Sequence, residues 1–244
     1  MTNAVTILRN LAFYPAFYGV SIVLVVLSLF AALFGYEPLR RVVEAWSNWH
    51  RWCARHLLNI RIVFDGSIPL EPVLYVVKHE SFFEAIEAPI VFGMPAVFAK
   101  RELFDIPGWG RSARLYGLIP VARDKGARAL REMIATARQR VGEGRPLVIF
   151  PEGTRVRHGD MPDLQAGFAG IYKLLGLPVV PIAVDSGPLY HRAWKRAGTI
   201  TYRIGERIPA GLTRDEAEKQ VHRAINALNR EQRLGALTGG STSE

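Results

Sequence analysis

A histidine and a carboxylate follow an apolar segment that is typical of a buried strand. His79 comes two residues after the segment Leu74–Val77, and Glu84 follows five positions later. Strand ends are where α/β proteins place their sites, and a helix N-terminus close by would discourage protonation of a histidine. Neutral imidazole is the form that a general base requires. The pair therefore predicts acid–base chemistry, with a purely structural histidine as the alternative.

The spacing of the pair sets a condition on its geometry. Five residues of α-helix correspond to about 140° of rotation, so the two side chains cannot face each other on one helix. They meet only if His79 lies in a loop and Glu84 lies in the first turn of the helix that follows. The carboxylate would then hold the ring N–H and stabilise the imidazolium that forms during catalysis.

A second candidate motif is the turn Phe150–Arg155, which follows the apolar segment Leu147–Phe150. Its proline and glycine form a tight turn from which Thr154 and Arg155 project. Backbone N–H groups, a hydroxyl and a guanidinium together suit a phosphate group. An ordinary strand-to-helix turn is the alternative. The chain has no Gly-rich lysine loop for phosphates and no dinucleotide glycine fingerprint after a strand, which argues against nucleotide-driven chemistry.

Three basic residues each follow an apolar run, namely Lys100, Arg123 and Arg155. Exposure to solvent is the usual state of lysine and arginine, so surface charges are one interpretation. Residues that follow the strands of a parallel sheet gather at one end of that sheet. The pattern therefore predicts that the three cations lie at the same end of the sheet.

Strand-like and helical segments alternate from residue 59 to residue 234. The expected strands are 61–64, 74–77, 96–99, 147–150, 179–184 and 199–204. Helical periodicity occupies Gly126–Val141, and Thr213 with Glu216 forms a capping box that opens a further helix. The alternation predicts an α/β domain with a mostly parallel central sheet flanked by helices. The Gly/Ser/Thr-rich residues 235–244 are expected to be a disordered tail.

The first 58 residues have a different character and are expected to associate with a membrane. No charged residue occurs between Arg9 and Glu37, and this run exceeds the roughly 20 residues that a membrane-spanning helix needs. A cleaved signal peptide has a shorter apolar run and small residues at its cleavage site, so a retained segment is favoured. Pro15 and Gly19 could bend the run, which leaves a full span and a re-entrant segment both open.

The next segment, Glu37–Asn59, is typical of an amphipathic helix at the membrane–water boundary. Trp46, Trp49 and Trp52 recur at every third residue and form one stripe, accompanied by arginines that favour anionic headgroups. Packing of this helix on the soluble domain is an alternative, and both roles can hold at once. Arginines after the apolar run predict that the C-terminal domain faces the cytoplasm.

The charge balance favours an anionic partner. Lysine and arginine total 31 against 22 aspartate and glutamate, which gives a formal net charge of +9. Such a balance suits anionic lipid, phosphate groups or nucleic acid, and the uncharged N-terminal run argues for lipid and against nucleic acid. The single cysteine, Cys53, excludes an internal disulfide.

Together these segments resemble the bacterial 1-acyl-sn-glycerol-3-phosphate acyltransferases, the lysophosphatidate acyltransferase branch of the glycerolipid acyltransferase family. The resemblance covers roughly residues 73–208 and rests on four blocks in the family's order. They are His79 with Glu84, the run Gly117–Arg123, the complete turn Phe150–Arg155 and the apolar segment Val180–Val184. The departure is Glu84, where the family usually has aspartate, although charge and reach are retained.

The resemblance implies transfer of a fatty acyl group from a thioester, on coenzyme A or acyl carrier protein, to the sn-2 hydroxyl of lysophosphatidate. In the acyltransferase domain, residues 59–234, His79 would be the base and Glu84 its partner. The residues implied to hold the lysolipid phosphate are Lys100, Arg123, Glu152, Gly153, Thr154 and Arg155. No metal and no cofactor besides the acyl donor are implied.

The resemblance also implies a location and leaves two alternatives. The expected location is the bacterial inner membrane, with the catalytic domain facing the cytoplasm and the anionic membrane surface as a partner. A different lysolipid acceptor, such as lyso-ornithine lipid, is one alternative. The other is a basic peripheral membrane protein that binds lipid without turnover.

Overall fold

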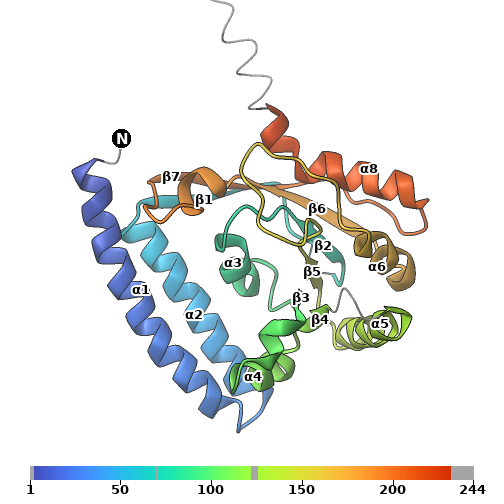
Figure 1. Ribbon diagram of the computed structural model, residues 1–244, viewed down its shortest axis with the longest axis horizontal. Helices are drawn as coiled ribbons and strands as arrows, with labels where there is room; N and C mark the ends of the chain where they lie inside the picture. Colours follow the sequence, from blue (N-terminus) through green and yellow to red (C-terminus); the bar gives the residue numbers. More distant parts are fainter. Residues whose placement is uncertain (1–2, 70, 122–125, 232–244) are drawn as a thin grey trace, which may run out of the picture.

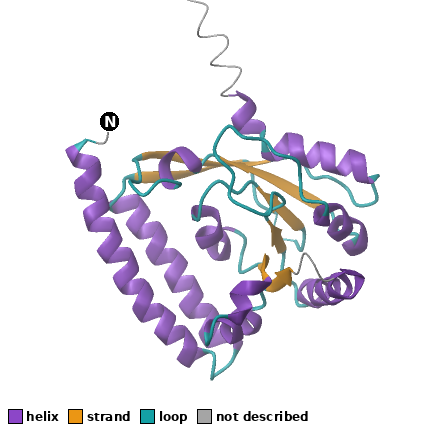
Figure 2. Ribbon diagram, in the orientation of Figure 1, coloured by secondary structure: helices purple, strands orange, loops and turns teal. Residues whose placement is uncertain are grey.

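A seven-stranded sheet separates two groups of helices in the computed structural model, which describes residues 3–69, 71–121 and 126–231 (Figures 1 and 2). The strand order is β1-β7-β6-β2-β5-β3-β4. The strands are β1 (Ile60–Asp65), β2 (Leu74–Val77), β3 (Ala96–Lys100), β4 (Ile119–Val121), β5 (Leu147–Ile149), β6 (Val179–Val184) and β7 (Gly198–Ile204). Among the described residues, five of the six strand pairings are parallel, and only β6 and β7 run antiparallel. The expected α/β class with a mostly parallel sheet is therefore confirmed.

The helices of the described residues are placed on both faces of this sheet. They are α1 (Ala4–Ala31), α2 (Tyr36–His56), α3 (Phe83–Val91), α4 (Trp109–Tyr116), α5 (Gly126–Gly142), α6 (Gly167–Leu175), α7 (Gly187–Tyr190) and α8 (Arg214–Ile225), with a 3-10 turn, η1, at Arg101–Asp105. The predicted capping box is present, because the Thr213 hydroxyl accepts from the Glu216 N–H and the Glu216 carboxylate accepts from the Thr213 N–H. The tail predicted at 235–244 lies outside the described residues.

Both faces of the central strands are buried, which explains why those strands are apolar without interruption. In β2, Tyr75 and Val77 pack into the core under α1, α2 and α3, whereas Leu74 and Val76 pack against α5, α6 and α8. Successive side chains of a strand point to opposite faces, so a strand covered on both sides needs apolar residues at every position. The sheet is thus the middle layer of three.

The parallel pairings bring the ends of four strands to one edge of the sheet. β2 pairs with β5, β5 with β3, and β3 with β4, all in the same direction. In this register Lys100 lies opposite Val121. The loops that follow Val77, Lys100, Val121 and Ile149 therefore start from a common edge, as the sequence predicted for its candidate motifs.

The N-terminal residues form an antiparallel helical hairpin, α1 and α2, along one side of the molecule (Figure 1). α1 continues through Pro15 and Gly19 without a break. Its length and composition are those of a helix that could cross a membrane. One stripe, Asn10, Phe13, Phe17 and Ser21, is buried against the protein, and most of the opposite apolar face is exposed.

The predicted tryptophan stripe divides between two environments. Trp46 donates to the Ser21 hydroxyl at 2.9 Å, and Trp49 donates to the Ala16 carbonyl at 3.2 Å, so both indoles bind α2 to α1. Trp52 stacks on Trp49 with ring centroids 5.0 Å apart and is exposed. The packing role that the sequence left open is thus present, and only Trp52 remains available to a membrane surface.

Candidate active site

His79 and Glu84 meet in the geometry that their spacing requires. α3 begins at Phe83, so Glu84 lies in its first turn, and His79 lies in the loop between β2 and α3. The His79 Nδ1 is 3.3 Å from Glu84 Oε2. The His79 side chain is 15% exposed and the Glu84 side chain is fully buried. With Nδ1 turned toward the carboxylate, the Nε2 atom is left to receive a proton from a substrate.

Three hydrogen-bond donors hold the Glu84 carboxylate in place. Besides His79, the Ser81 N–H donates to Oε2 at 3.1 Å, and the Ser186 hydroxyl donates to Oε1. The Ser81 and Ser186 hydroxyls are themselves 2.7 Å apart. Several donors around a buried carboxylate fix its orientation. The arrangement can therefore orient an imidazole and balance the charge that it acquires.

The Phe150–Arg155 turn lies directly beside His79. The rings of His79 and Phe150 stack with centroids 4.2 Å apart. The Val156 N–H donates to the His79 carbonyl at 2.8 Å, which joins the end of the turn to the histidine loop. Gly153 takes a φ of 66°, a conformation that glycine adopts at little cost. Two motifs that are about 70 residues apart in the chain thus form one site.

Glu152 requires a correction to the predicted phosphate-binding set. Its side chain is buried, with one oxygen 2.5 Å from the Lys78 Nζ and the other accepting from the His79 N–H at 3.0 Å. Burial raises the pKa of the Glu152 carboxyl, and the Lys78 ammonium opposes that shift. Because both of its oxygens are engaged in this way, the Glu152 carboxylate supports the loop that carries His79 and does not face a ligand.

The other predicted phosphate-binding residues are exposed or partly exposed at the same edge, where they are described. Thr154 and Lys100 are exposed, Gly153 is partly buried, and the Arg155 guanidinium lies 3.8 Å from the centre of the exposed Phe82 ring. Arg123 lies outside the described residues, and Val121, two positions before it in the sequence, pairs with Lys100. The structure thus brings the Lys100 and Arg155 segments to the His79 edge, and their contact with phosphate stays a prediction.

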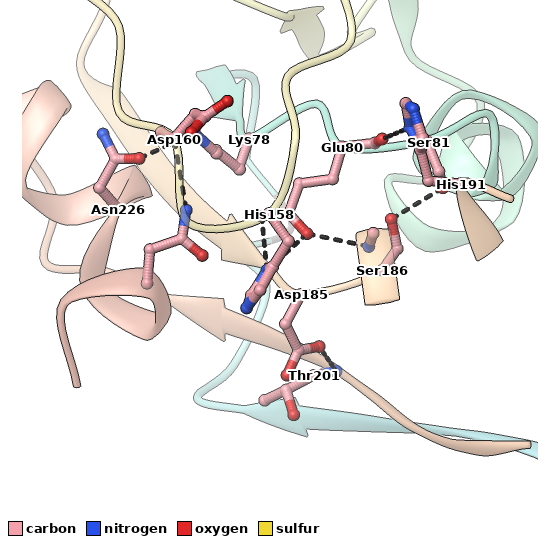
Figure 3. A network of polar contacts seen from close by, with 12 residues as sticks. Lys78, Glu80, Ser81, His158, Asp160, Asp185, Ser186, His191, Thr201 and Asn226 are labelled. Atoms are coloured by element: carbon pink, nitrogen blue, oxygen red, sulfur yellow. Dashed lines mark hydrogen bonds and ion pairs between the residues drawn. The ribbon is translucent and has the colours of Figure 1, made fainter. Parts of the chain in front are cut away.

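A second polar network surrounds Glu80, the residue that follows His79 (Figure 3). Both oxygens of Glu80 are 2.9 Å from the His158 Nδ1, and Oε2 also accepts from the Gly187 N–H. The Glu80 carbonyl is 2.7 Å from the His191 Nδ1. Successive residues of one loop therefore point apart, with His79 toward Glu84 and Glu80 toward the start of α7. This fixes the loop from both sides.

Sequence reasoning missed two residues that support the site, namely Ser186, which contacts Glu84, and Lys78, which contacts Glu152. Ser186 follows β6 just as the predicted motifs follow their strands, so the rule applied to those motifs would have found it. Lys78 is buried, and its ammonium contacts Glu152, the Asp160 carbonyl and Asn226. No pattern in the sequence indicates that a lysine beside a histidine turns inward.

Cys53 lies outside this site. It is buried in α2, and burial raises the pKa of its thiol to about 11. Because the thiolate is the reactive form of cysteine, such a thiol is a poor nucleophile. Fold and site together therefore define an α/β protein in which a histidine held by a carboxylate follows a strand of a mostly parallel sheet.

Comparison with known proteins identifies the family of this chain. A family model described as Acyltransferase matches residues 50–185. The 1-acyl-sn-glycerol-3-phosphate acyltransferase of Pseudomonas aeruginosa is 31% identical over 248 residues, which cover 99% of this chain and 93% of the relative. The human 1-acyl-sn-glycerol-3-phosphate acyltransferase beta is 28% identical over 162 residues, which cover 63% of this chain and 58% of the relative.

A solved structure shares the fold. The crystal structure of the 1-acyl-sn-glycerophosphate (LPA) acyltransferase PlsC from Thermotoga maritima matches with a TM-score of 0.72 and 23% identity, covering 93% of this chain and 98% of that one. The chain belongs to the acyltransferase family, and the resemblance drawn from its four sequence blocks is confirmed.

Proposed function

We propose that this protein transfers a fatty acyl group from a thioester to the sn-2 hydroxyl of lysophosphatidate, giving phosphatidate. The observation that carries the proposal is the His79–Glu84 pair at 3.3 Å with the Phe150–Arg155 turn packed against it. The relative that aligns over nearly the whole chain supports it, since it is named for 1-acyl-sn-glycerol-3-phosphate.

The proposed reaction is a direct transfer with His79 as the base. Its Nε2 takes the proton from the acceptor hydroxyl while the hydroxyl oxygen attacks the thioester carbonyl. The tetrahedral oxyanion then collapses, the carbon–sulfur bond breaks, and the imidazolium returns a proton to the thiolate. Glu84 stabilises the imidazolium between these steps. The reaction needs no acyl-enzyme, metal or cofactor, so the thioester is the only activated group.

The phosphate of the acceptor would be held by the predicted residues other than Glu152. They are Lys100, Arg123, Gly153, Thr154 and Arg155. A guanidinium and an ammonium at one edge of the sheet suit a group that carries nearly two negative charges. The acyl donor would be coenzyme A thioester or acyl carrier protein, both anionic, toward which a net charge of +9 is favourable.

A thioester-release assay on membranes that contain the protein tests this function. Lysophosphatidate and lyso-ornithine lipid are offered in parallel as acceptors, and thiol release is measured with each. The proposal expects release that depends on lysophosphatidate. Release that depends on lyso-ornithine lipid alone would assign a different acceptor, and no release with either would indicate a lipid-binding protein without turnover.

Substitution of Arg155 separates acceptor binding from other roles. Loss of a hydrogen bond to a charged group costs about 1.5–3 kcal/mol, roughly a factor of 10 to 100 in affinity. Arg155→Ala is therefore expected to raise the KM for lysophosphatidate by that factor and to leave the KM for the thioester nearly unchanged. Arg155→Lys should rescue only partly, because an ammonium lacks the planar fork that grips two phosphate oxygens.

The control for this prediction is a variant that removes an arginine charge at the opposite edge of the sheet. Arg207 pairs with Glu71, which precedes β2, so Arg207→Ala removes the same charge far from His79. It should leave both KM values unchanged. A raised thioester KM in Arg155→Ala would assign Arg155 to the donor, and an unchanged acceptor KM would reject the phosphate role.

We propose that the protein associates with the bacterial inner membrane through α1, and that α1 lies in one leaflet without crossing the bilayer. Polar contacts fix α1 to the protein along its length. The Asn10 amide exchanges two hydrogen bonds with the Lys195 main chain, the Tyr14 hydroxyl donates to the Ala193 carbonyl, and Ser21 accepts from Trp46. A helix that is fixed to the protein along one side can expose only its opposite face to lipid. The catalytic domain would face the cytoplasm.

Charges placed on the exposed face of α1 test this attachment. Ile22 is 67% exposed and Phe30 is 59% exposed. Burying one large apolar side chain contributes about 1.5–3 kcal/mol, so Ile22→Lys with Phe30→Lys should lower partitioning into lipid vesicles by at least about tenfold per site. Vesicle flotation measures this. Leu174→Lys, on α6 in the other helical layer, should float like the wild type, and equal losses in both variants would contradict the proposal.

A further inference from the structure

A buried histidine joins the N-terminal hairpin to the catalytic layer. His50, on α2, is fully buried. Its Nδ1 is 2.7 Å from Glu87 Oε1, and its Nε2 is 2.8 Å from the Tyr190 hydroxyl. The other Glu87 oxygen accepts from the Arg51 Nε at 2.7 Å. Both ring nitrogens of His50 and both oxygens of Glu87 are thus engaged.

The two partners of His50 lie on the two elements that hold the catalytic carboxylate. Glu87 is three residues after Glu84 on α3, so the two carboxylates share one side of the helix. Tyr190 ends α7, and its N–H donates to the carbonyl of Ser186, which precedes α7. The Ser186 hydroxyl donates to Glu84. α3 and α7 are therefore linked near His79 by Glu84 and Ser186, and about one turn further along each helix by His50.

Aromatic packing makes this link rigid. The His50 ring contacts the rings of Phe17 and Phe83 at 5.2 Å and that of Tyr190 at 5.5 Å between centroids. Phe17 belongs to α1 and Phe83 begins α3. A buried polar network whose members are all hydrogen-bonded favours one arrangement of the elements it joins, since any other leaves a group unpaired.

We propose that His50 is a positioning residue that, through Glu87 and Tyr190, fixes Glu84 against His79, so that the α1–α2 hairpin completes the catalytic geometry. This inference rests on the proposed acyl transfer. A misplacement of about 1 Å in a catalytic group can lower a rate by about 10²-fold. The hairpin is thus part of the machinery and more than an anchor.

Tyr190→Phe is the least invasive test, because it removes one hydroxyl and keeps the ring. The expected result is a kcat about tenfold below that of the wild type, with the KM values for thioester and lysophosphatidate within about twofold. Tyr172→Phe is the matched control, since its hydroxyl also makes a hydrogen bond, to the Pro209 carbonyl at 2.6 Å, but from α6 on the other face of the sheet. Equal kcat losses in the two variants would overturn the proposal.

A double-mutant cycle shows whether the effect passes through Glu84. Tyr190→Phe is measured alone and together with Glu84→Gln. If Tyr190 acts by holding Glu84, its removal has little further effect once the carboxylate is gone. The same tenfold loss in both backgrounds would overturn the inference. His50→Phe, which fills the space of the ring without its hydrogen bonds, should follow Tyr190→Phe in both backgrounds.

A readout without substrate separates this inference from the proposed function. Carbethoxylation of His79 by diethyl pyrocarbonate, followed by peptide mass spectrometry, reports how firmly the imidazole is held. The rate is expected to rise at least about threefold in Tyr190→Phe and to stay at the wild-type value in Tyr172→Phe. If the wild type does not acylate lysophosphatidate, the function fails while this comparison still decides the positioning role. Equal His79 rates in all three proteins would overturn the positioning role.

Discussion

Replacing His79 by alanine is expected to abolish acyl transfer while leaving the protein folded. A general base contributes typically about 10²–10⁴-fold to a rate. The side chain is partly exposed and its main packing contact is the Phe150 ring, so its loss should change the melting temperature little. Thioester release with lysophosphatidate measures the activity, and thermal unfolding confirms the fold. Wild-type rates in a folded variant would reject the mechanism.

Substitutions of Glu84 are the control for this result. Glu84→Gln keeps the shape of the side chain but removes the charge that stabilises the imidazolium, so a severe loss of kcat is expected. Glu84→Asp keeps the charge on a side chain that is one methylene shorter, and a smaller loss is expected. If the glutamine variant retained more activity than the aspartate variant, reach rather than charge would be the essential property.

The second large effect is on stability, at the buried pair of Lys78 and Glu152. Both side chains are almost completely buried, 2.5 Å apart. Removing one partner of such a pair leaves an uncompensated charge and costs about 3–5 kcal/mol. In a protein of this size that corresponds to a melting temperature lower by roughly 6–20 °C. Glu152→Ala should show this shift in thermal unfolding, together with a loss of activity.

Two further variants identify the cause of the shift. Lys78→Met combined with Glu152→Gln removes both charges of this pair and keeps an acceptor for the His79 N–H. The double variant should therefore recover most of the lost stability. Glu71→Gln breaks a half-exposed pair with Arg207 and should cost at most about 1 kcal/mol. A Glu152→Ala protein as stable as the wild type would show that the carboxylate is not needed to compensate Lys78.

The sheet was largely predictable because its central strands are covered on both faces. The predicted bounds of β2 and β6 match the structure, since each is an unbroken apolar run. β4 was not predicted as a strand, because its three residues include Pro120 and give too short a pattern. Its presence follows from pairing with β3, a contact that no local pattern encodes.

The site was predictable where chemistry follows a strand, and not where it depends on burial. His79 and Glu84 were found because they follow the strand-like segment Leu74–Val77 and match one of the four family blocks. The inward turn of Glu152 was missed because Thr154 and Arg155 of the same motif are exposed, and nothing local distinguishes Glu152 from them. His50 was assigned to a basic membrane-binding helix, yet it contacts Glu87, 37 residues later in the chain. Such contacts arise only when the hairpin packs on α3.

The contact between Lys78 and Asn226 has a consequence for the order of events during synthesis. The Lys78 Nζ donates to Asn226 Oδ1 at 2.8 Å, and the two residues are 148 positions apart in the chain. At about 5–20 residues per second, a ribosome needs roughly 7 to 30 s to add that length. The apolar helix α1 is therefore translated well before Asn226 can bind Lys78, the residue next to His79. The nascent chain can thus reach a membrane before the loop that carries His79 has gained this contact.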